Sequence, residues 1–371
     1  MSASEIPPPS LVAHYNGLAA HGADGYPAAS RVLLQGLRAG LPPAAATTVS
    51  SEGGTCYRAA GGWANLGHRS AEPVAATMDT LFDLASLTKV IVTTPLVLLL
   101  HQRQAWDLDD RISRWLPGAP RSAVTIRQCM THTAGLVPHR PYFSFQQDAG
   151  QLKQAVLAEL RAAVPGPVCY SDLSFMLLGW AAENCAGEAL DVLARREVLE
   201  PLGMTRSCYR PAAGVEGIAA TEVNGDQRPQ DEAIWGTVHD GNAFAMGGVS
   251  GHAGLFAPVD DLNQFATALL RPRTHPVLRA ETIRLMTTQH AATGSDARAL
   301  GWRLRPSGWG RWPQGTFWHT GFTGTSMLIS PRADTAVILL TNFVHPARRP
   351  DEAEVMRTRL HRAVLRARLS S

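Results

Sequence analysis

Two residues in the first quarter of the chain have the types and spacing needed for covalent catalysis. Ser86 and Lys89 stand three residues apart in the run FDLASLTK, where a helix is predicted to begin. Residues i and i+3 share one face of a helix, so the Lys89 amine can reach the Ser86 hydroxyl. A serine needs a neighbouring base to become a nucleophile, and a lysine with a lowered pKa can be that base. The N–H of Ser86 at a helix N-terminus would also stabilise an oxyanion.

The scarcity of lysine draws attention to Lys89. Of the 34 lysines and arginines in the chain, only Lys89 and Lys153 are lysines. An arginine stays protonated and cannot replace a lysine that must lose a proton. A Ser-x-x-Lys spacing also arises by chance, so a capping Ser86 beside a solvated Lys89 remains the alternative interpretation of the pair alone.

The segments around this pair resemble the active-site regions of the serine β-lactamase and penicillin-binding protein superfamily. The resemblance is greatest to the class C β-lactamase-related branch, which also contains D-alanyl-D-alanine carboxypeptidases, D-aminopeptidases and carboxylesterases. It is carried, in the family's order, by LFDLASLTKVIVTTPLVLLL, LDDRISRWLPGAP, IRQCMTHTAGL, VCYSDLSFMLLGW, EPLGMTRSCYRP, VHDGNAFAMGGVSGHAGLFA and WHTGFTGTSMLISP. These matches cover about residues 81–342. They imply an α+β fold of the β-lactamase/transpeptidase type, in which an antiparallel sheet is flanked by helices and a helical domain is inserted.

The resemblance implies roles for the first two motifs. Ser86 would be the acylated nucleophile and Lys89 its base. The family's second motif, Tyr-x-Asn, corresponds to Tyr170-Ser171-Asp172, and Tyr170 would relay a proton to the leaving group. Asp172 departs from the family's Asn, and a carboxylate near Lys89 would hold that lysine protonated. Two alternatives follow: Tyr170 is the real base, or Asp172 faces another partner.

The third motif, Lys-Thr-Gly in β-lactamases, corresponds to His319-Thr320-Gly321. The resemblance implies a strand edge that lines the cleft, where the small Gly321 permits close approach. The N–H of Phe322 would be the second oxyanion donor. A histidine resembles the carboxypeptidase and D-aminopeptidase members more than β-lactamases, since it is a cation only below its pKa. We expect these four residues, with Asp172, to bind substrate.

Other candidate residues have simpler interpretations. We expect His132 and His252 to hold loops by hydrogen bonds. His239-Asp240 precedes His252 without the spacing of a metal motif such as H-E-x-x-H, so no metal and no cofactor is expected. The absence of a G-x-S-x-G elbow argues against an α/β-hydrolase. The arginines at 357–368 are interpreted as the solvated face of the last helix.

Hydrophobic periodicity and turn residues predict the elements that must position these side chains. Helices are predicted at 30–38, 86–103, 148–162, 172–185, 188–199 and 350–369, and strands at 47–50, 56–63, 300–304, 316–320, 326–330 and 335–341. We expect residues 1–28 to form a tail or irregular lead-in. Residues 29–103 and 255–371 would form an α/β domain around a helical insert at 104–254, together one catalytic unit.

The composition limits the remaining possibilities. The 371 residues are 45% hydrophobic, enough for a sizeable core, and the net charge of +3 argues against nucleic-acid binding. No apolar run reaches the ~18 residues of a membrane helix. The N-terminus has no signal-peptide pattern, so we expect a cytoplasmic location, or a periplasmic one if the start is mis-assigned or trimmed. The five cysteines form no C-x-x-C pair and indicate neither zinc nor a disulfide framework, and the sequence gives no oligomeric state.

These observations predict a metal-independent serine hydrolase that forms an acyl-enzyme on Ser86. Its expected substrates are small molecules: esters, small amides or D-amino-acid peptides. A true β-lactamase is one alternative, although His319 argues against efficient β-lactam turnover. A non-catalytic sensor that binds muropeptides or β-lactams on the same fold is another, and a purely structural or interaction protein is a third.

Overall fold

A computed structural model describes residues 18–67, 72–146, 148–211, 217–223, 225 and 233–370. Most of the predicted N-terminal lead-in, residues 1–17, therefore lies outside the described residues. Its next residues are more regular than expected, because Leu18–His21 forms strand β1 and pairs with β3. The chain thus enters the fold as an edge strand.

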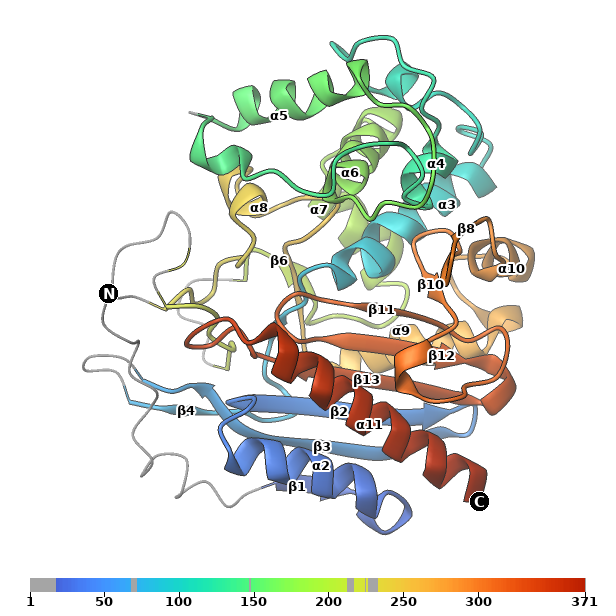
Figure 1. Ribbon diagram of the computed structural model, residues 1–371. Helices are drawn as coiled ribbons and strands as arrows, with labels where there is room; N and C mark the ends of the chain where they lie inside the picture. The colour runs from blue at the N-terminus through green and yellow to red at the C-terminus, as the bar shows by residue number, and fades with distance from the viewer. Residues whose placement is uncertain are drawn as a thin grey trace.

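One antiparallel sheet crosses the lower half of the molecule in the order β1-β3-β2-β13-β12-β11-β10-β9-β8, with β4 paired to β3 (Figure 1). Its strands are Leu18–His21 (β1), Ala44–Ser51 (β2), Gly54–Asn65 (β3), Val74–Ala75 (β4), Ala291–Thr293 (β8), Asp296–Arg298 (β9), Arg303–Leu304 (β10), Phe317–Thr320 (β11), Ser326–Ser330 (β12) and Thr335–Thr341 (β13). A second antiparallel sheet, in the order β5-β7-β6, contains Phe82–Asp83 (β5), Cys208–Tyr209 (β6) and Leu255–Ala257 (β7). Because β2 pairs with β13, strands from the two ends of the chain meet in the centre of the large sheet.

Both faces of the central strands are buried, which explains why β13 reads as a continuous apolar run. Successive side chains of a strand point to opposite faces. Val337 and Leu339 join the apolar cluster of α2 and α11, whereas Ile338 and Leu340 join the larger cluster on the other face. A strand covered on both faces has no polar side to alternate with.

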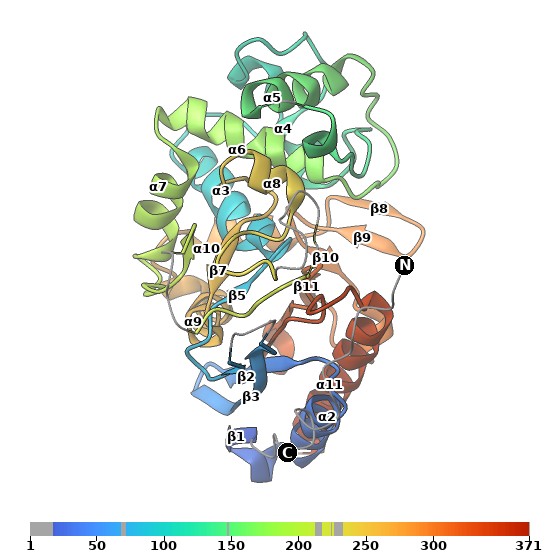
Figure 2. The ribbon, with the colours of Figure 1, turned by 90° about the vertical axis from the view of Figure 1, so that its left-hand side faces the viewer.

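Helices cover the two faces of the sheet unequally. Their bounds are Pro27–Arg38 (α2), Thr94–Gln102 (α3), Ile126–Met130 (α4), Ala149–Ala158 (α5), Asp172–Ala186 (α6), Leu190–Ala194 (α7), Gly241–Ala245 (α8), Val259–Leu270 (α9), Ala280–Thr287 (α10) and Pro350–Ser370 (α11). The helices α2 and α11 lie side by side on the outer face (Figures 1 and 2). The helix α9 packs on the opposite face, and α3 to α7 gather above the sheet in Figure 1.

Most of the predicted elements are confirmed. The predicted hairpin is the β2–β3 pair, and the last two predicted strands coincide with β12 and β13. The first, fourth and last predicted helices are α2, α6 and α11. The predicted helix after Ser86 is divided into a π-helical turn, Lys89–Thr93, and α3.

The last third of the chain is more helical than predicted, because α9 and α10 lie at 259–287, where neither a helix nor a strand was predicted. The helix α9 buries Val259, Leu262, Phe265 and Leu269, which follow a helical period. The strand predicted at 300–304 is reduced to β10, and β8 and β9 form a hairpin that was not predicted.

The proposed division into domains stays a prediction. Strand β6 belongs to the predicted insert, residues 104–254, but it pairs with β7 outside that segment. Among the described residues, no helix combines the length and the apolar character needed to cross a membrane.

Candidate active site

Ser86 follows a strained turn between β5 and the helical segment that begins at Leu87. Ala85 has φ 46°, in the left-handed region that non-glycine residues seldom adopt. The buried Asp83 stabilises this turn, because its Oδ1 accepts the Ala85 N–H at 2.8 Å and its Oδ2 accepts the His239 N–H at 2.6 Å. Burial raises the pKa of Asp83. The turn leaves Ser86 partly accessible in an otherwise buried segment.

Lys89 is fully buried, and its Nζ has three acceptors. It donates to Ser86 Oγ at 2.9 Å and to the His252 carbonyl at 3.0 Å, and it forms an ion pair with Asp172 Oδ1 at 2.8 Å. Burial alone would lower the pKa of Lys89, but the Asp172 charge and the nearby Tyr170 outweigh burial and raise it. The geometry is that of an ammonium group, since three donors meet three acceptors.

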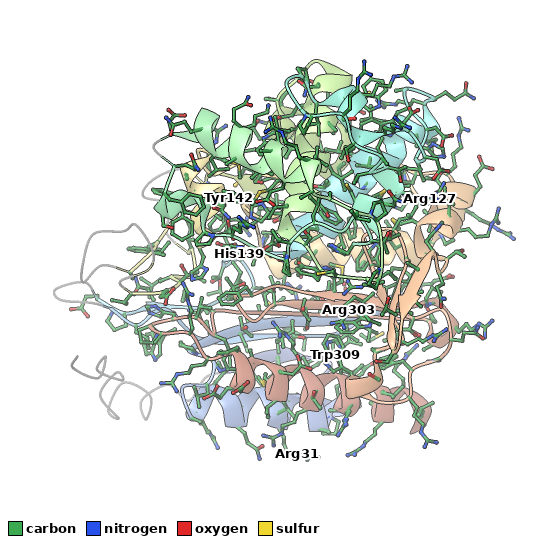
Figure 3. The ribbon with its side chains drawn as sticks, turned by 45° about the horizontal axis from the view of Figure 1, so that its top comes forward. Arg31, Arg127, His139, Tyr142, Arg303 and Trp309 are labelled. Carbon is green, nitrogen blue, oxygen red and sulfur yellow. The ribbon has the colours of Figure 1, made fainter. Side chains whose placement is uncertain are left out.

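Asp172 lies in the first turn of α6 and faces Lys89, so one sequence alternative, that it faces only another partner, is wrong. Burial would raise the pKa of Asp172, but the charge of Lys89, the hydrogen bond with His139 and the charge of His252 outweigh burial and lower it. Its second oxygen, Oδ2, is 3.3 Å from His139 Nδ1. Figure 3 shows His139 at the lower edge of the helical region, on the side of the sheet.

Tyr170 lies beside Lys89, whose Nζ is 5.2 Å from the centre of the tyrosine ring. His132 packs against this ring at 4.5 Å between ring centres, and its Nδ1 accepts the Ser171 N–H at 3.0 Å. The loop-holding role predicted for His132 is therefore confirmed. Burial first, and then the charges of Arg298 and Lys89, hold the pKa of His132 well below its usual value.

The third motif places His319 beside Tyr170. His319 lies on β11, almost fully buried, with its ring centre 6.0 Å from that of Tyr170. Its Nδ1–H donates to the Thr320 carbonyl at 2.8 Å, whereas its buried Nε2 has no partner among the described residues. Burial, followed by the charges of Lys89 and Arg298, keeps the pKa of His319 well below 6.5. The residue is therefore neutral near pH 7.

Gly321 brings the end of β11 against the serine turn. A Cβ at this position would lie 2.4 Å from the Leu84 carbonyl oxygen, so no larger residue fits. Thr323 Oγ1 donates to the Asp83 carbonyl at 2.7 Å, and Thr325 Oγ1 donates to the Leu84 carbonyl at 3.2 Å. The first and third motifs are thus joined by hydrogen bonds.

Two backbone N–H groups at this junction are available to a ligand. Neither the N–H of Ser86 nor that of Phe322 has an acceptor in the part of the chain that the structure describes. The Phe322 side chain is 52% exposed and stacks on His239 at 5.6 Å between ring centres. Unpaired donors of this kind can stabilise an oxyanion.

Several residues of the site were missed by sequence reasoning. The Arg298 guanidinium is 5.7 Å from the Tyr170 ring centre and pairs with Asp296, and its buried Nε and Nη1 have no partner among the described residues. Arg357 was assigned to a solvated helix face, which is wrong, because it is buried and donates from Nη2 to the Gly321 carbonyl at 2.6 Å. In a chain so rich in arginine, no local signal marks these two.

The remaining histidines near the site form hydrogen bonds within the protein. His252 is buried between Ser250, 2.7 Å from its Nδ1, and Asp240, 2.9 Å from its Nε2, so its predicted loop-holding role is confirmed. His239 Nε2 lies 3.0 Å from Glu222 Oε2. No cluster of three His, Cys, Asp or Glu side chains suited to a metal ion occurs within the described ranges.

The family follows from a direct comparison. The model of the Beta-lactamase family matches residues 33–360, which is most of the chain. The chain therefore belongs to the beta-lactamase family, and the family expected from the motifs is confirmed.

The chain is also similar to individual proteins. A protein of Escherichia coli (strain K12) with the name "Putative D-alanyl-D-alanine carboxypeptidase" is 33% identical over 314 residues, which cover 74% of this chain and 71% of that protein. A protein of the same name from Salmonella enteritidis PT4 (strain P125109) is 30% identical over 315 residues, covering 74% of this chain and 72% of that protein.

Solved structures show the same fold at lower identity. EstCE1, described as a hydrolase with promiscuous acyltransferase activity, has a TM-score of 0.74 at 22% identity and covers 92% of this chain and 99% of its own. The penicillin-binding protein homologue from Pyrococcus abyssi has a TM-score of 0.70 at 18% identity and covers 88% of this chain and 75% of its own. The expected β-lactamase/transpeptidase-like α+β fold is confirmed.

Proposed function

We propose that this chain is a serine hydrolase that forms an acyl-enzyme on Ser86. The contact that carries the proposal is the 2.9 Å hydrogen bond from Lys89 Nζ to Ser86 Oγ, made by a buried lysine that is also paired with Asp172. A buried charge needs a partner, and an ordinary surface lysine would need neither burial nor three acceptors.

The proton balance favours Tyr170 as the base, because Lys89 already carries its proton. In acylation, Ser86 Oγ attacks the carbonyl carbon, its proton passes to the Tyr170 oxygen, and the Tyr170 hydroxyl gives its own proton to the leaving group. The Lys89 ammonium provides the counter-charge. In deacylation, water attacks the acyl carbon, its proton passes to Tyr170, and Ser86 regains a proton.

The negative oxygen of each tetrahedral intermediate would be bound by the N–H groups of Ser86 and Phe322. Neither N–H is used elsewhere in the described residues. Thr320, Gly321 and the exposed Phe322 would contact the substrate, with His319 as a neutral neighbour. Asp172 would act through Lys89.

The substrates proposed are esters, small amides and D-amino-acid peptides. The relatives' names point to carboxypeptidase activity, and the description of EstCE1 points to hydrolysis and acyl transfer. Arg298 favours a leaving group with a free carboxylate, because its guanidinium places a positive charge beside Tyr170. A neutral His319 in place of the β-lactamase lysine disfavours β-lactam hydrolysis.

The test is a Ser86-dependent activity screen. The wild type and Ser86→Ala are assayed with p-nitrophenyl esters, D-alanine amide, a D-alanyl-D-alanine peptide and nitrocefin, with Ser307→Ala as an exposed control. We expect the wild type and the control, but not Ser86→Ala, to hydrolyse the ester, amide or peptide substrates, with little turnover of nitrocefin. We also expect a mass increase at Ser86 after treatment of the wild type with a fluorophosphonate. A Ser86→Ala variant with full activity would overturn the mechanism, and binding without acylation would favour the sensor.

The cytoplasmic location also stays a prediction. Cell fractionation with an antibody against the chain would test it, with the periplasmic fraction as the competing outcome.

A further inference from the structure

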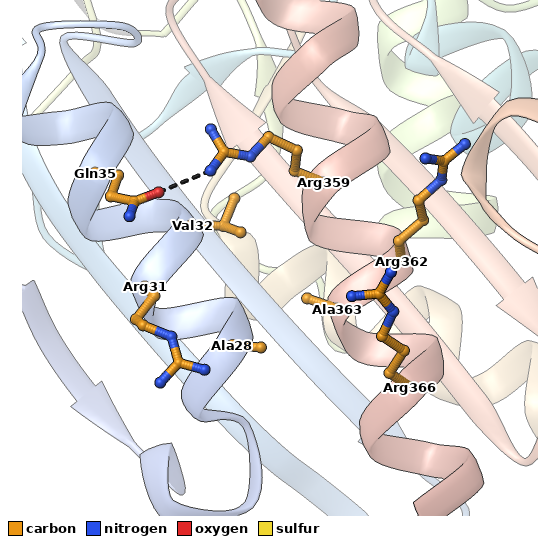
Figure 4. Close-up of a pocket in the computed structure, with 8 residues that line it drawn as sticks. All are labelled: Ala28, Arg31, Val32, Gln35, Arg359, Arg362, Ala363 and Arg366. Atoms are coloured by element: carbon orange, nitrogen blue, oxygen red, sulfur yellow. Dashed lines mark hydrogen bonds between the residues drawn. The ribbon is translucent and has the colours of Figure 1, made fainter.

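A basic groove lies on the outer face of the molecule, between α2 and α11 (Figure 4). Its volume is about 360 Å³. Its charged lining residues are all arginines, and its floor is apolar. The lining residues are Ala28, Arg31, Val32, Gln35, Arg359, Arg362, Ala363 and Arg366. We call this the arginine groove.

The arginine groove has no acidic residue in its lining. No Asp or Glu occurs in α2, and α11 contains none after Glu354. These two stretches hold seven arginines in a chain whose net charge is only +3. Arg31 and Arg362 are exposed and form no ion pair within the described residues.

Helix stability alone does not explain this arrangement. Cations stabilise a helix in its last turn, which accounts for Arg38 and Arg368 but not for the four arginines that line the groove. Like charges three or four residues apart destabilise a helix, and Arg359, Arg362 and Arg366 have these spacings. An anion in the groove would remove that repulsion.

The spacing of the arginines indicates the size of the anion. Arg359 and Arg366 are seven residues apart on α11, which is about 10 Å along a helix axis. Arg31 lies on α2, the opposite wall of the groove, and Arg359 reaches across to Gln35 Oε1 at 2.7 Å (Figure 4). A guanidinium binds phosphate oxygens through two parallel hydrogen bonds, and one phosphate is too small to engage arginines spread over this length.

We propose that the arginine groove binds an oligophosphate, a linear anion of three or more phosphate groups. The groove lies across the sheet from α3 and Ser86, so this binding is independent of the proposed hydrolase. A recessed groove between two helices fits a narrow chain better than a flat anionic bilayer. The apolar floor leaves room for an organic group attached to the phosphates.

Calorimetry with the full chain and inorganic triphosphate tests the proposal. We expect saturable binding that weakens with added salt. The variant Arg362→Gln/Arg366→Gln should bind at least about tenfold more weakly, since each lost contact is a charge-assisted hydrogen bond. Arg31→Gln, from the opposite wall, should also weaken binding. The control Arg121→Gln/Arg273→Gln, which removes two exposed arginines elsewhere, should change affinity less than twofold.

Two further binding experiments distinguish a nucleotide from a membrane surface as the source of the bound phosphates. Binding of adenosine triphosphate with an affinity equal to or higher than that of inorganic triphosphate supports the proposal. A higher affinity would show that the adenine base contacts the apolar floor. No saturable binding by the wild type, or an equal loss in the groove and control variants, overturns it. Cosedimentation with phosphatidylglycerol vesicles without triphosphate binding also overturns it and assigns the face to a membrane surface. Ester hydrolysis by every variant confirms folding.

Discussion

Lys89 and His319 are equally buried a few ångströms from Tyr170, yet they hold opposite protonation states. Lys89 has the Asp172 carboxylate at 2.8 Å, which raises its pKa against the effect of burial. His319 has no such partner and lies near Lys89 and Arg298, so burial and like charge act together and lower its pKa. One carboxylate therefore decides which side of the site is charged.

The largest expected effect comes from replacing Lys89, the charged member of the pair. Lys89→Met should lower kcat/KM by at least about 1,000-fold, because the counter-charge beside Ser86 and Tyr170 is lost. It also leaves Asp172 buried without its partner, so a lower Tm is expected. Lys153→Met is the matched control, since Lys153 is the only other lysine. Ester hydrolysis and fluorophosphonate labelling measure both variants, and near-normal labelling of Lys89→Met would contradict the assignment.

The next largest effect is expected from replacing the Asp172 carboxylate. Asp172→Asn restores the family's usual residue and leaves burial as the main influence on Lys89, so the pKa of that lysine falls. If the ammonium is the working form, kcat/KM should fall about 10- to 100-fold, and most at alkaline pH. A pH–rate profile measures this. A variant as active as the wild type at pH 8 would mean that neutral Lys89 is the base.

A smaller effect is expected from the helix that holds the third motif. Arg357→Met removes the donor to the Gly321 carbonyl, which lies beside the proposed oxyanion donor Phe322. We expect kcat/KM to fall about tenfold, with kcat affected more than KM, because a misplaced donor weakens the transition state. Arg362→Met, on the exposed face of the same helix, is the control. Equal kinetics of the two variants would show that the contact has no influence on the site.

The smallest expected effect is on the pH dependence of stability, and it comes from replacing His319, the neutral member of the pair. The folded pKa of His319 lies below its unfolded value near 6.5, so its neutral state contributes stability that is lost as the pH falls below 6.5. His319→Gln should remove up to about 1.4 kcal/mol per pH unit from the slope of unfolding free energy between pH 6 and 4.5. Urea unfolding across this range measures it, and an unchanged slope would contradict the assignment.

His139 is an internal control, because its pKa is shifted in the direction opposite to that of His319. Its hydrogen bond to Asp172 raises its pKa above the unfolded value. The stability it contributes is therefore present below pH 6.5 and is lost as the pH rises through the raised pKa. His139→Gln should leave the acidic slope as it is and change the slope just above pH 6.5.

The three motifs were predictable from the sequence because each is a short run with distinctive residues. Ser86, Lys89 and Tyr170 are identified by local spacing and family resemblance. The partners that set their chemistry were not, because Arg298 and Arg357 approach from distant elements and look like any other arginine. The protonation of Lys89 depends on the side-chain direction of Asp172, which spacing left open. The helix α9 was missed although its buried apolar residues follow a helical period, since no element was predicted between residues 254 and 300.

The pairing of β2 with β13 has a consequence for the synthesis of the protein. The ribosome releases Ser86 and Lys89 early, but β13 and α11 emerge only after more than 330 residues. Until then β2 has only β3 as a neighbour, Gly321 lacks Arg357, and the two oxyanion donors are not assembled. A nascent or truncated chain would therefore carry the serine without the activity, and hydrolysis would begin only when translation is nearly complete.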